Sequence, residues 1–160
     1  MRKYINLVVV VVVLVVIDQI TKLLALHNIV PGGVIPITSF FNFTLIFNTG
    51  GAFGFLSQSS EALRAAVFIA AVSLIIIVMI AFYVHYYRKS FWASLWITMI
   101  ISGAVGNLID RVRLQKVVDF LDLHAFGYHW PAFNFADICV TLGIIFFIIY
   151  VLFEGVSRKR

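Results

Sequence analysis

Four long apolar runs, separated by shorter polar stretches, set the pattern of this chain. They extend over about residues 4–26, 64–87, 90–110 and 137–156. No acidic residue, Lys or Arg occurs between Ala65 and Tyr87 or between Ser90 and Ile109. A helix needs ~20 apolar residues to cross ~30 Å of hydrocarbon. The pattern therefore predicts a membrane α-helical fold with four transmembrane helices, formed as one integral-membrane domain over residues 1–160.

The start of the chain has two interpretations. Met1-Arg2-Lys3 followed by an apolar run is typical of a secretory signal peptide. No small-residue cleavage site follows this run, and three further apolar runs do. We therefore interpret it as a retained first transmembrane helix.

The first long connection, about residues 28–60, contains an alternating segment. Phe41, Phe43, Leu45 and Phe47 fall on one face of an extended segment, and the polar residues Asn42, Thr44 and Asn48 fall on the other. Such alternation predicts a strand with one apolar face. The Asn-Thr-Gly-Gly sequence that begins at Asn48 predicts the turn that ends it. We expect a small extracytoplasmic β-sheet lying on the membrane surface.

The third connection, about residues 112–136, is rich in aromatic side chains. Tyr and Trp favour the headgroup level of a bilayer. We therefore expect an extracytoplasmic aromatic loop at the membrane interface. Its aromatic residues are Phe120, Phe126, Tyr128, Trp130, Phe133 and Phe135.

Composition excludes a soluble domain, because 62% of the residues are hydrophobic, 12% are charged and the mean hydropathy is +1.06. A net charge of +5 can indicate nucleic-acid binding, but the basic residues form no stripe. They form short clusters beside apolar runs, at Arg2-Lys3, Arg88-Lys89 and Arg158-Lys159-Arg160. This is the positive-inside pattern of membrane topology, and it predicts no nucleic-acid partner. We expect both termini to be cytoplasmic, so that seven basic residues and Glu154 lie inside.

In this orientation the carboxylates gather at the outer face. Five of the seven acidic residues lie at the ends of apolar runs or between them. A charge at the bilayer centre costs at least ~2.5–3.5 kcal/mol, so carboxylates near lipid are functional candidates. These five are Asp18, Asp110, Asp119, Asp122 and Asp137.

Asp119 and Asp137 could meet across the membrane boundary. Two neighbouring carboxylates share one proton, so one can activate water while the other protonates a carbonyl oxygen. This chemistry is that of an aspartyl hydrolase and needs no metal or cofactor. Each residue also has a structural interpretation. Asp137 could stabilise a helix N-terminus capped by Asn134, and Asp119, like Asp122, could be a solvated loop acid.

Other catalytic chemistries lack the residues that they need. A single cysteine, Cys139, excludes an intramolecular disulfide and a thiolate-rich zinc site. No His is near it in sequence, and we expect a small core residue. The four histidines lack the spacing of a helical zinc site, so we expect no metal; they are His27, His85, His124 and His129.

Two polar clusters are candidates for supporting the pair, with structural packing as the alternative for both. Asp18 and Lys22 share one helix face at i and i+4. Gly103 and Gly106 allow another helix to approach closely. Asn107 and Arg111 also share a face and could hold a helix or a substrate backbone. Arg111 directly follows Asp110.

Five ordered motifs resemble the bacterial lipoprotein signal peptidases, also called signal peptidase II, over nearly the whole chain. The motifs are Asp18-Gln19-x-Thr21-Lys22, Phe47-Asn48-Thr49-Gly50-Gly51-Ala52-Phe53-Gly54, Gly106-Asn107-Leu108-Ile109-Asp110-Arg111, Val118-Asp119-Phe120 and Phe133-Asn134-Phe135-Ala136-Asp137. The resemblance implies that Asp119 and Asp137 are catalytic. It also implies substrate-contact or supporting roles for Asp18, Lys22, Asn48, Gly103, Asn107, Asp110, Arg111, Asn134 and Ala136.

The resemblance further implies an activity and a location. Such an enzyme removes signal peptides from diacylglyceryl-modified prolipoproteins, cutting just before the lipidated Cys. It is a multi-pass protein of the bacterial cytoplasmic membrane, acts at the outer leaflet among membrane lipids, and is a target of globomycin.

The alternative from another class is a small four-helix proton-coupled transporter. Such proteins usually carry the essential carboxylate in the middle of a helix, within a central chamber. The acidic residues here gather at one face instead. A purely structural membrane scaffold would leave five outer carboxylates without a purpose.

Overall fold

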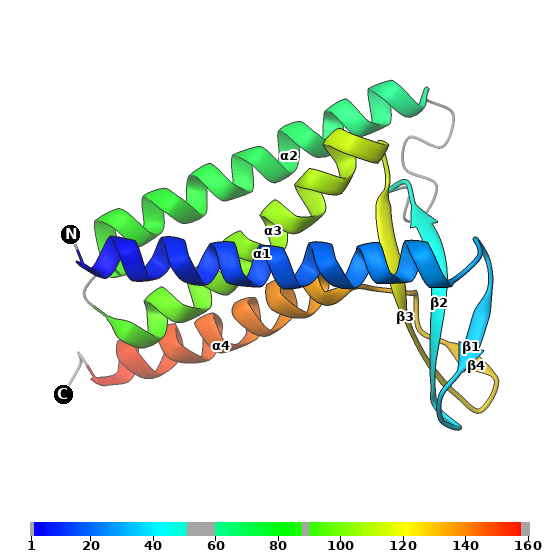
Figure 1. Cartoon of the computed structure of the whole chain (residues 1–160). Coiled ribbons are helices and arrows are strands. Elements are labelled where there is room, and N and C mark those ends of the chain that lie inside the picture. Colours follow the sequence, from blue (N-terminus) through cyan, green and yellow to red (C-terminus); the bar gives the residue numbers. More distant parts are fainter. Residues whose placement is uncertain (1, 51–59, 88–89, 158–160) are drawn as a thin grey trace.

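The computed structural model describes residues 2–50, 60–87 and 90–157. Its long helices are α1 (Arg2–Asn28), α2 (Glu61–Phe82), α3 (Phe91–Leu114) and α4 (Phe135–Ser157). They run side by side, and α1 begins at the end of the bundle where α4 finishes (Figure 1). Each is long and apolar enough to cross a membrane, as predicted. A short π-helix, η2 (Tyr83–Tyr87), continues α2.

Parts of the predicted pattern lie outside the described residues. These are residues 51–54 of the glycine-containing motif and the basic clusters at 88–89 and 158–160.

Helix α3 is the central element of the bundle, because it packs against each of the other three helices. It is also far more buried than they are. Many Val, Ile and Leu side chains of α1, α2 and α4 point outward instead. An outward apolar surface of this kind is what a helix presents to lipid rather than to water.

Glycines set the close approach of α3 and α4. A Cβ on Gly103 would overlap the carbonyl oxygen of Ala136. A Cβ on Gly143, two turns further along α4, would lie 2.7 Å from Cγ1 of Ile100. Gly106 has the same function towards α1, because a Cβ there would lie 2.5 Å from a carboxylate oxygen of Asp18. The predicted close packing at Gly103 and Gly106 is confirmed.

A four-stranded antiparallel sheet crosses the end of the bundle at which α1 ends and α4 begins (Figure 1). Its order is β1 (Val34–Pro36), β2 (Phe41–Asn48), β3 (Val117–Ala125) and β4 (Tyr128–His129). The predicted strand is confirmed as β2. The third connection, expected to be an aromatic loop, instead supplies β3 and β4. The reason is that Val117–Ala125 pairs with β2 along most of its length and so completes the sheet.

An extra residue in β2 changes which of its side chains share a face. Phe43 pairs with Leu121, whereas Ile46, three residues further on, pairs with Asp119, only two residues back. Side chains two apart share a face, so Phe43 and Ile46 do as well. This irregularity is a β-bulge. The predicted alternation is therefore wrong from Leu45 onward, where the apolar side chains move to the opposite face.

This second face forms the core between the sheet and the bundle. Leu45, Val118 and Phe120 of the sheet are buried against Ala25 and Ile29 at the end of α1. The last turns of α1 thus hold the sheet, and with it the first half of β3, in a fixed position over the helices.

Gly143→Ala should lower the melting temperature of the purified protein, because the added methyl group meets Ile100 and the Trp96 carbonyl in a close-packed contact. Overpacking of this kind costs roughly 1–3 kcal/mol. Ile148→Val also changes one methyl group of α4, at a position that is 53% exposed, and should leave the melting temperature unchanged. Equal melting temperatures for Gly143→Ala and the parent protein would contradict the packing role.

Candidate active site

Asp137 lies in the first turn of α4, where it takes part in a reciprocal cap. The side chain of Asn134 accepts a hydrogen bond from the Asp137 backbone N–H at 3.0 Å. The Asp137 carboxylate Oδ2 accepts one from the Asn134 backbone N–H at 3.1 Å. Such a capping box stabilises a helix start. The structural interpretation of Asn134 and Asp137 is thus correct, and it leaves Oδ1 of Asp137 for other contacts.

Two amides connect Asp137 with Asp119, the candidate carboxylate in β3. Asn134 Nδ2 donates to Asp119 Oδ1 at 2.7 Å and to Asn107 Oδ1 at 3.1 Å. Asn107 Nδ2 in turn donates to Asp137 Oδ1 at 2.8 Å. Asp119 is only 1% exposed. The two carboxylates that are far apart in sequence therefore belong to one hydrogen-bonded site.

Asn48 holds the second oxygen of Asp119, with Nδ2 donating to Oδ2 at 3.0 Å. The β-bulge makes this contact possible, because it places Asn48 on the same face of the sheet as Asp119. The Asn48 side chain also accepts a hydrogen bond from the backbone N–H of Gly50 at 2.8 Å. Gly50 has φ of +83°, a conformation that favours glycine.

Burial dominates the electrostatics of Asp119. It raises the pKa of the Asp119 carboxyl to about 6, and the neighbouring charge of Asp137 acts in the same direction. Hydrogen bonds from Asn48 and Asn134 lower this pKa but do not cancel the effect of burial. Asp119 is thus protonated more readily than an exposed aspartate is.

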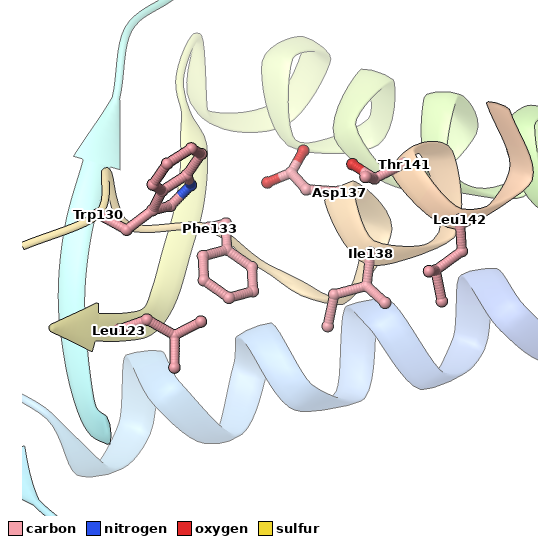
Figure 2. Close-up of a pocket in the computed structure, with 7 residues that line it drawn as sticks. All are labelled: Leu123, Trp130, Phe133, Asp137, Ile138, Thr141 and Leu142. Carbon is pink, nitrogen blue, oxygen red and sulfur yellow. The ribbon is translucent and has the colours of Figure 1, made fainter. Parts of the chain in front are cut away.

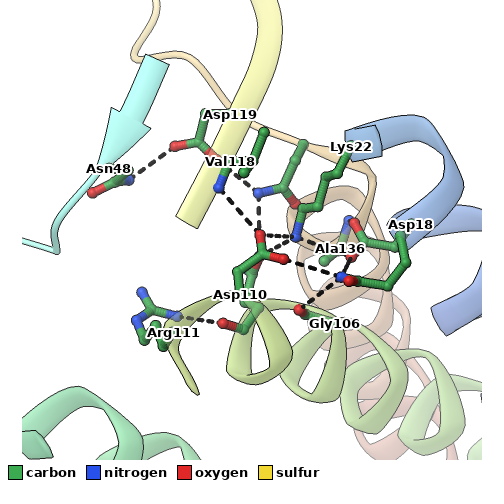
Figure 3. A network of polar contacts seen from close by, with 12 residues as sticks. Asp18, Lys22, Asn48, Gly106, Asp110, Arg111, Val118, Asp119 and Ala136 are labelled. Atoms are coloured by element: carbon green, nitrogen blue, oxygen red, sulfur yellow. Dashed lines mark hydrogen bonds and ion pairs between the residues drawn. The ribbon is translucent and has the colours of Figure 1, made fainter. Parts of the chain in front are cut away.

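Lys22 is a buried cation of the site, at 2% exposure. Figure 3 shows its polar contacts with the residues around it. Its Nζ lies 2.9 Å from Asp18 Oδ2 and 2.8 Å from Asp110 Oδ2, and it donates to Asn107 Oδ1 at 3.0 Å. The predicted pairing of Asp18 and Lys22 is confirmed. The other oxygen of Asp18 accepts the backbone N–H of Ala136 at 2.9 Å, so this pair also positions the start of α4.

Asp110 connects this charge cluster with β3. Its Oδ2 accepts the backbone N–H of Val118, the residue before Asp119, at 3.1 Å. Gln19 adds a connection that the sequence analysis did not single out. Its Nε2 donates to Asp18 Oδ2, to Asp110 Oδ1 and to the Gly106 carbonyl, at 3.1 to 3.2 Å. Its place beside Asp18 in the first motif was the only signal for it.

Arg111 forms no ion pair with a carboxylate of the described residues. Nη1 donates to the Asn107 carbonyl at 3.4 Å, and the guanidinium lies over the ring of Phe68 in α2, 5.3 Å from its centroid. It is therefore beside the site rather than within the hydrogen-bonded chain of amides and carboxylates.

Asp122 lies outside the pair and is not the solvated loop acid that it was expected to be. It is 7% exposed and accepts hydrogen bonds from Asn42 Nδ2 at 2.8 Å and from His129 Nδ1 at 2.9 Å. Burial acts to raise the pKa of Asp122, but the hydrogen bonds from His129 and Asn42 outweigh it and hold that pKa below its usual value. Pairing of β3 with β2 and β4 supplies both partners.

A pocket of about 400 Å³ lies beside Asp137 (Figure 2). Leu123, Trp130 and Phe133, from β3 and the segment after β4, form one side. Residues of α4 form the other. The lining is apolar except for Asp137 and Thr141; its α4 members are Asp137, Ile138, Thr141 and Leu142.

Within the described ranges, no group of three or more His, Cys, Asp or Glu residues could hold a metal ion. Cys139 is 2% exposed, as expected of a core residue.

Comparisons with known proteins point to one family. The family model described as Signal peptidase (SPase) II matches residues 10–153. The lipoprotein signal peptidase of Desulforapulum autotrophicum is 39% identical over 97% of this chain and 96% of its own. That of Janthinobacterium sp. (strain Marseille) is 41% identical over 85% and 81%.

Solved structures agree with this assignment. A bacterial membrane enzyme determined by the in meso method at 1.9 Å resolution superposes with a TM-score of 0.83, at 32% identity over 92% of both chains. The chain belongs to the signal peptidase II family.

Proposed function

We propose that this protein is a membrane aspartic endopeptidase that removes signal peptides from diacylglyceryl-modified prolipoproteins, cutting before the lipidated Cys. Its membership of the signal peptidase II family supports the substrate. One observation supports the catalytic type: Asp119 and Asp137, from separate elements, lie in one chain of amide hydrogen bonds.

In the mechanism that we propose, Asp119 is the acid and Asp137 the base. The buried Asp119 holds a proton and donates it to the oxygen of the scissile carbonyl. Asp137 lies at a helix N-terminus, where the dipole favours negative charge, and takes a proton from the attacking water. The hydroxyl adds to the carbonyl carbon. The C–N bond then breaks as Asp137 returns its proton to the leaving nitrogen, and Asp119 regains its own.

The other site residues hold this pair in position. Asn107, Asn134 and Asn48 orient the carboxylate oxygens. Lys22 balances the buried charges of Asp18 and Asp110, which in turn fix the backbone beside Asp137 and Asp119; Gly103 and Ala136 allow α3 and α4 to meet there. Arg111, at the edge of the site, is available to donate to a substrate carbonyl.

The charge distribution and the fold support the location that we propose. The dyad lies at the sheet end of the bundle, which we assign to the outer leaflet of the bacterial cytoplasmic membrane. A lipid-anchored substrate reaches this level sideways through the bilayer, among membrane lipids. Globomycin-type inhibitors would compete for the same place.

The transporter alternative is not supported. The family that matches is one of peptidases, and the aspartates of α1, α3 and α4 lie towards the sheet rather than in a central chamber.

Asp119→Asn and Asp137→Asn should each lower turnover of a purified lipidated prolipoprotein by ~10² or more, since each removes one half of the acid–base pair. Glu61→Gln, a matched change at an exposed position, should keep full turnover. Cys139→Ala should also remain active. Near-normal turnover by either well-folded aspartate variant would refute the dyad, and loss of activity in Cys139→Ala would revive a thiol mechanism.

Turnover should fall as the pH rises through about 6, because Asp119 then loses the proton that it must donate. The Asn48 hydrogen bond lowers the pKa of Asp119. Its removal in Asn48→Leu should therefore raise this pKa and move the alkaline limb of the pH–rate profile to higher pH. Asn28→Leu, an exposed control, should leave the limb in place. A limb that moves to lower pH in Asn48→Leu would exclude Asp119 as the acid.

Asn107→Ala and Arg111→Ala should reduce turnover more than stability, and the loss of a positioning contact of this kind is worth about 10²-fold. Asn107 donates directly to the Asp137 carboxylate, so its effect should be the larger one. Melting temperature and turnover measured on the same preparations separate the roles. If both variants melt earlier but keep full specific activity, the two residues belong to helix packing alone.

Cysteine labelling tests the orientation. In a Cys139→Ala background, Ser39→Cys, between β1 and β2, should react with a membrane-impermeant thiol reagent added outside intact spheroplasts. Ser157→Cys, near the end of α4, should react only after lysis. The reverse pattern would overturn the assignment of the dyad to the outer leaflet.

A further inference from the structure

We propose that Trp130 is a specificity-determining residue, held in position by the Asp122–His129 pair, and that it contacts an aliphatic chain of the substrate next to the scissile bond. This inference rests on the proposed function, and it identifies one side of the substrate-binding site.

Trp130 forms the side of the pocket that faces Asp137. Its indole projects from the segment after β4 on the same side as Phe133 and Leu123, with α4 opposite (Figure 2). The indole is 70% exposed although it lines a concave surface. An aromatic group that is this exposed beside a pocket gains apolar contact when an occupant covers it.

The hairpin that carries Trp130 is short and depends on side chains for its position. β4 has two residues, paired with His124 and Ala125 of β3. His129, directly before Trp130, donates from Nδ1 to Asp122 at 2.9 Å, and its ring stacks on that of His124 with centroids 5.0 Å apart. The Trp130 backbone N–H then donates to the Leu123 carbonyl at 2.8 Å. We call Asp122 and His129 the hairpin clamp.

A further hydrogen bond holds the hairpin clamp against β2. Asn42 of β2 donates to the same Asp122 carboxylate at 2.8 Å and lies opposite it in the sheet. The clamp therefore connects the hairpin with the centre of the sheet. Asp119 lies in the same strand as Asp122, β3.

The position of Asp137 identifies the occupant. Because this carboxylate is itself part of the lining, whatever fills the pocket lies next to the bond that Asp137 acts on. Leu123, Ile138 and Leu142 give an aliphatic lining. In a lipidated prolipoprotein, two aliphatic groups flank the scissile bond: a side chain of the signal peptide before it, and the acyl chains on the Cys after it. The pocket takes one of these two.

Kinetics on two variants test the contact. Trp130→Ala should raise KM for a lipidated prolipoprotein roughly tenfold with little change in kcat, since it removes apolar contact with the substrate. Trp130→Phe should recover most of this loss. Trp92→Ala makes the same change at a residue that is 56% exposed, at the end of α3 that is far from the sheet. It should leave kcat and KM unchanged. Unchanged KM in Trp130→Ala would overturn the proposal.

Two substrate series distinguish the occupants. In one, Leu residues of the signal peptide near the cut are changed to Ala with the lipid kept constant. In the other, the acyl chains are shortened with the peptide kept constant. Trp130→Ala should weaken the dependence of kcat/KM on one series only, and that series names the occupant. If kcat/KM of the parent protein and of Trp130→Ala depends equally on both substrate series, the proposed contact is refuted.

A double-variant cycle tests the clamp. His129→Ala should raise KM, and the double variant His129→Ala/Trp130→Ala should be no worse than Trp130→Ala alone, because the clamp acts through the indole. Additive effects would show that His129 acts elsewhere.

A spectroscopic readout separates substrate contact from lipid contact. With Trp92→Phe, Trp96→Phe and Asp119→Asn combined, Trp130 is the last of the three tryptophans. Its emission should shift to the blue when lipidated prolipoprotein is added and not when lipid alone is added.

Tyr128 lies on the same hairpin and is 83% exposed. The Tyr128→Ala variant should keep the KM of the parent protein. An equal rise of KM in Tyr128→Ala would favour membrane anchoring and overturn the proposal. If Asp119→Asn and Asp137→Asn are inactive but Trp130→Ala is normal, the proposed function stands and this inference alone fails.

Discussion

A buried cation, Lys22, keeps two buried carboxylates at the end of the bundle that the sheet covers. Removing a charge from water is costly, and a buried ion is stable only when opposite charges and hydrogen bonds surround it. Asp18 and Asp110 provide the charges, and Asn107 provides an amide oxygen. These partners come from two helices, so the ammonium group fixes α1 against α3. Asp18 Oδ1 accepts the backbone N–H of Ala136, and Asp110 Oδ2, besides pairing with Lys22, accepts that of Val118, so the charge cluster sets where α4 and β3 begin. Asp110 Oδ1 accepts a hydrogen bond from Gln19.

The two candidate catalytic carboxylates differ because their supports differ. Asp119 belongs to a strand and is enclosed by side chains, so desolvation governs its proton affinity. Asp137 belongs to the first turn of a helix and accepts a backbone N–H. The chain of Asn134 and Asn107 between them carries no charge of its own. The two carboxylates therefore differ in the kind of secondary structure that carries them and in the groups that hold them.

Sequence alone was sufficient for features that depend on composition or short spacing. Long apolar runs predicted the helices, the i and i+4 spacing predicted the Asp18–Lys22 pair, and the Asn-x-x-Asp pattern predicted the cap of α4. Features that depend on pairing between distant segments were not accessible. The β-bulge moves Leu45 to the opposite face, and no local signal marks it. Likewise, the sequence around Asp122 suggested an acid in a solvated loop. Its partners Asn42 and His129 come from β2 and β4, which only the folded sheet brings to it.

The cap of α4 has a consequence for how such an enzyme can evolve. Asp137 is at once a proposed catalytic group and a member of the reciprocal bonds that start a membrane-spanning helix. A mutation that altered it to escape an inhibitor would lose chemistry and helix initiation together. Resistance by substitution at the centre of the site is thereby closed off. Sequence drift is left to exposed side chains of the sheet, such as Tyr128, that take no part in the start of a helix.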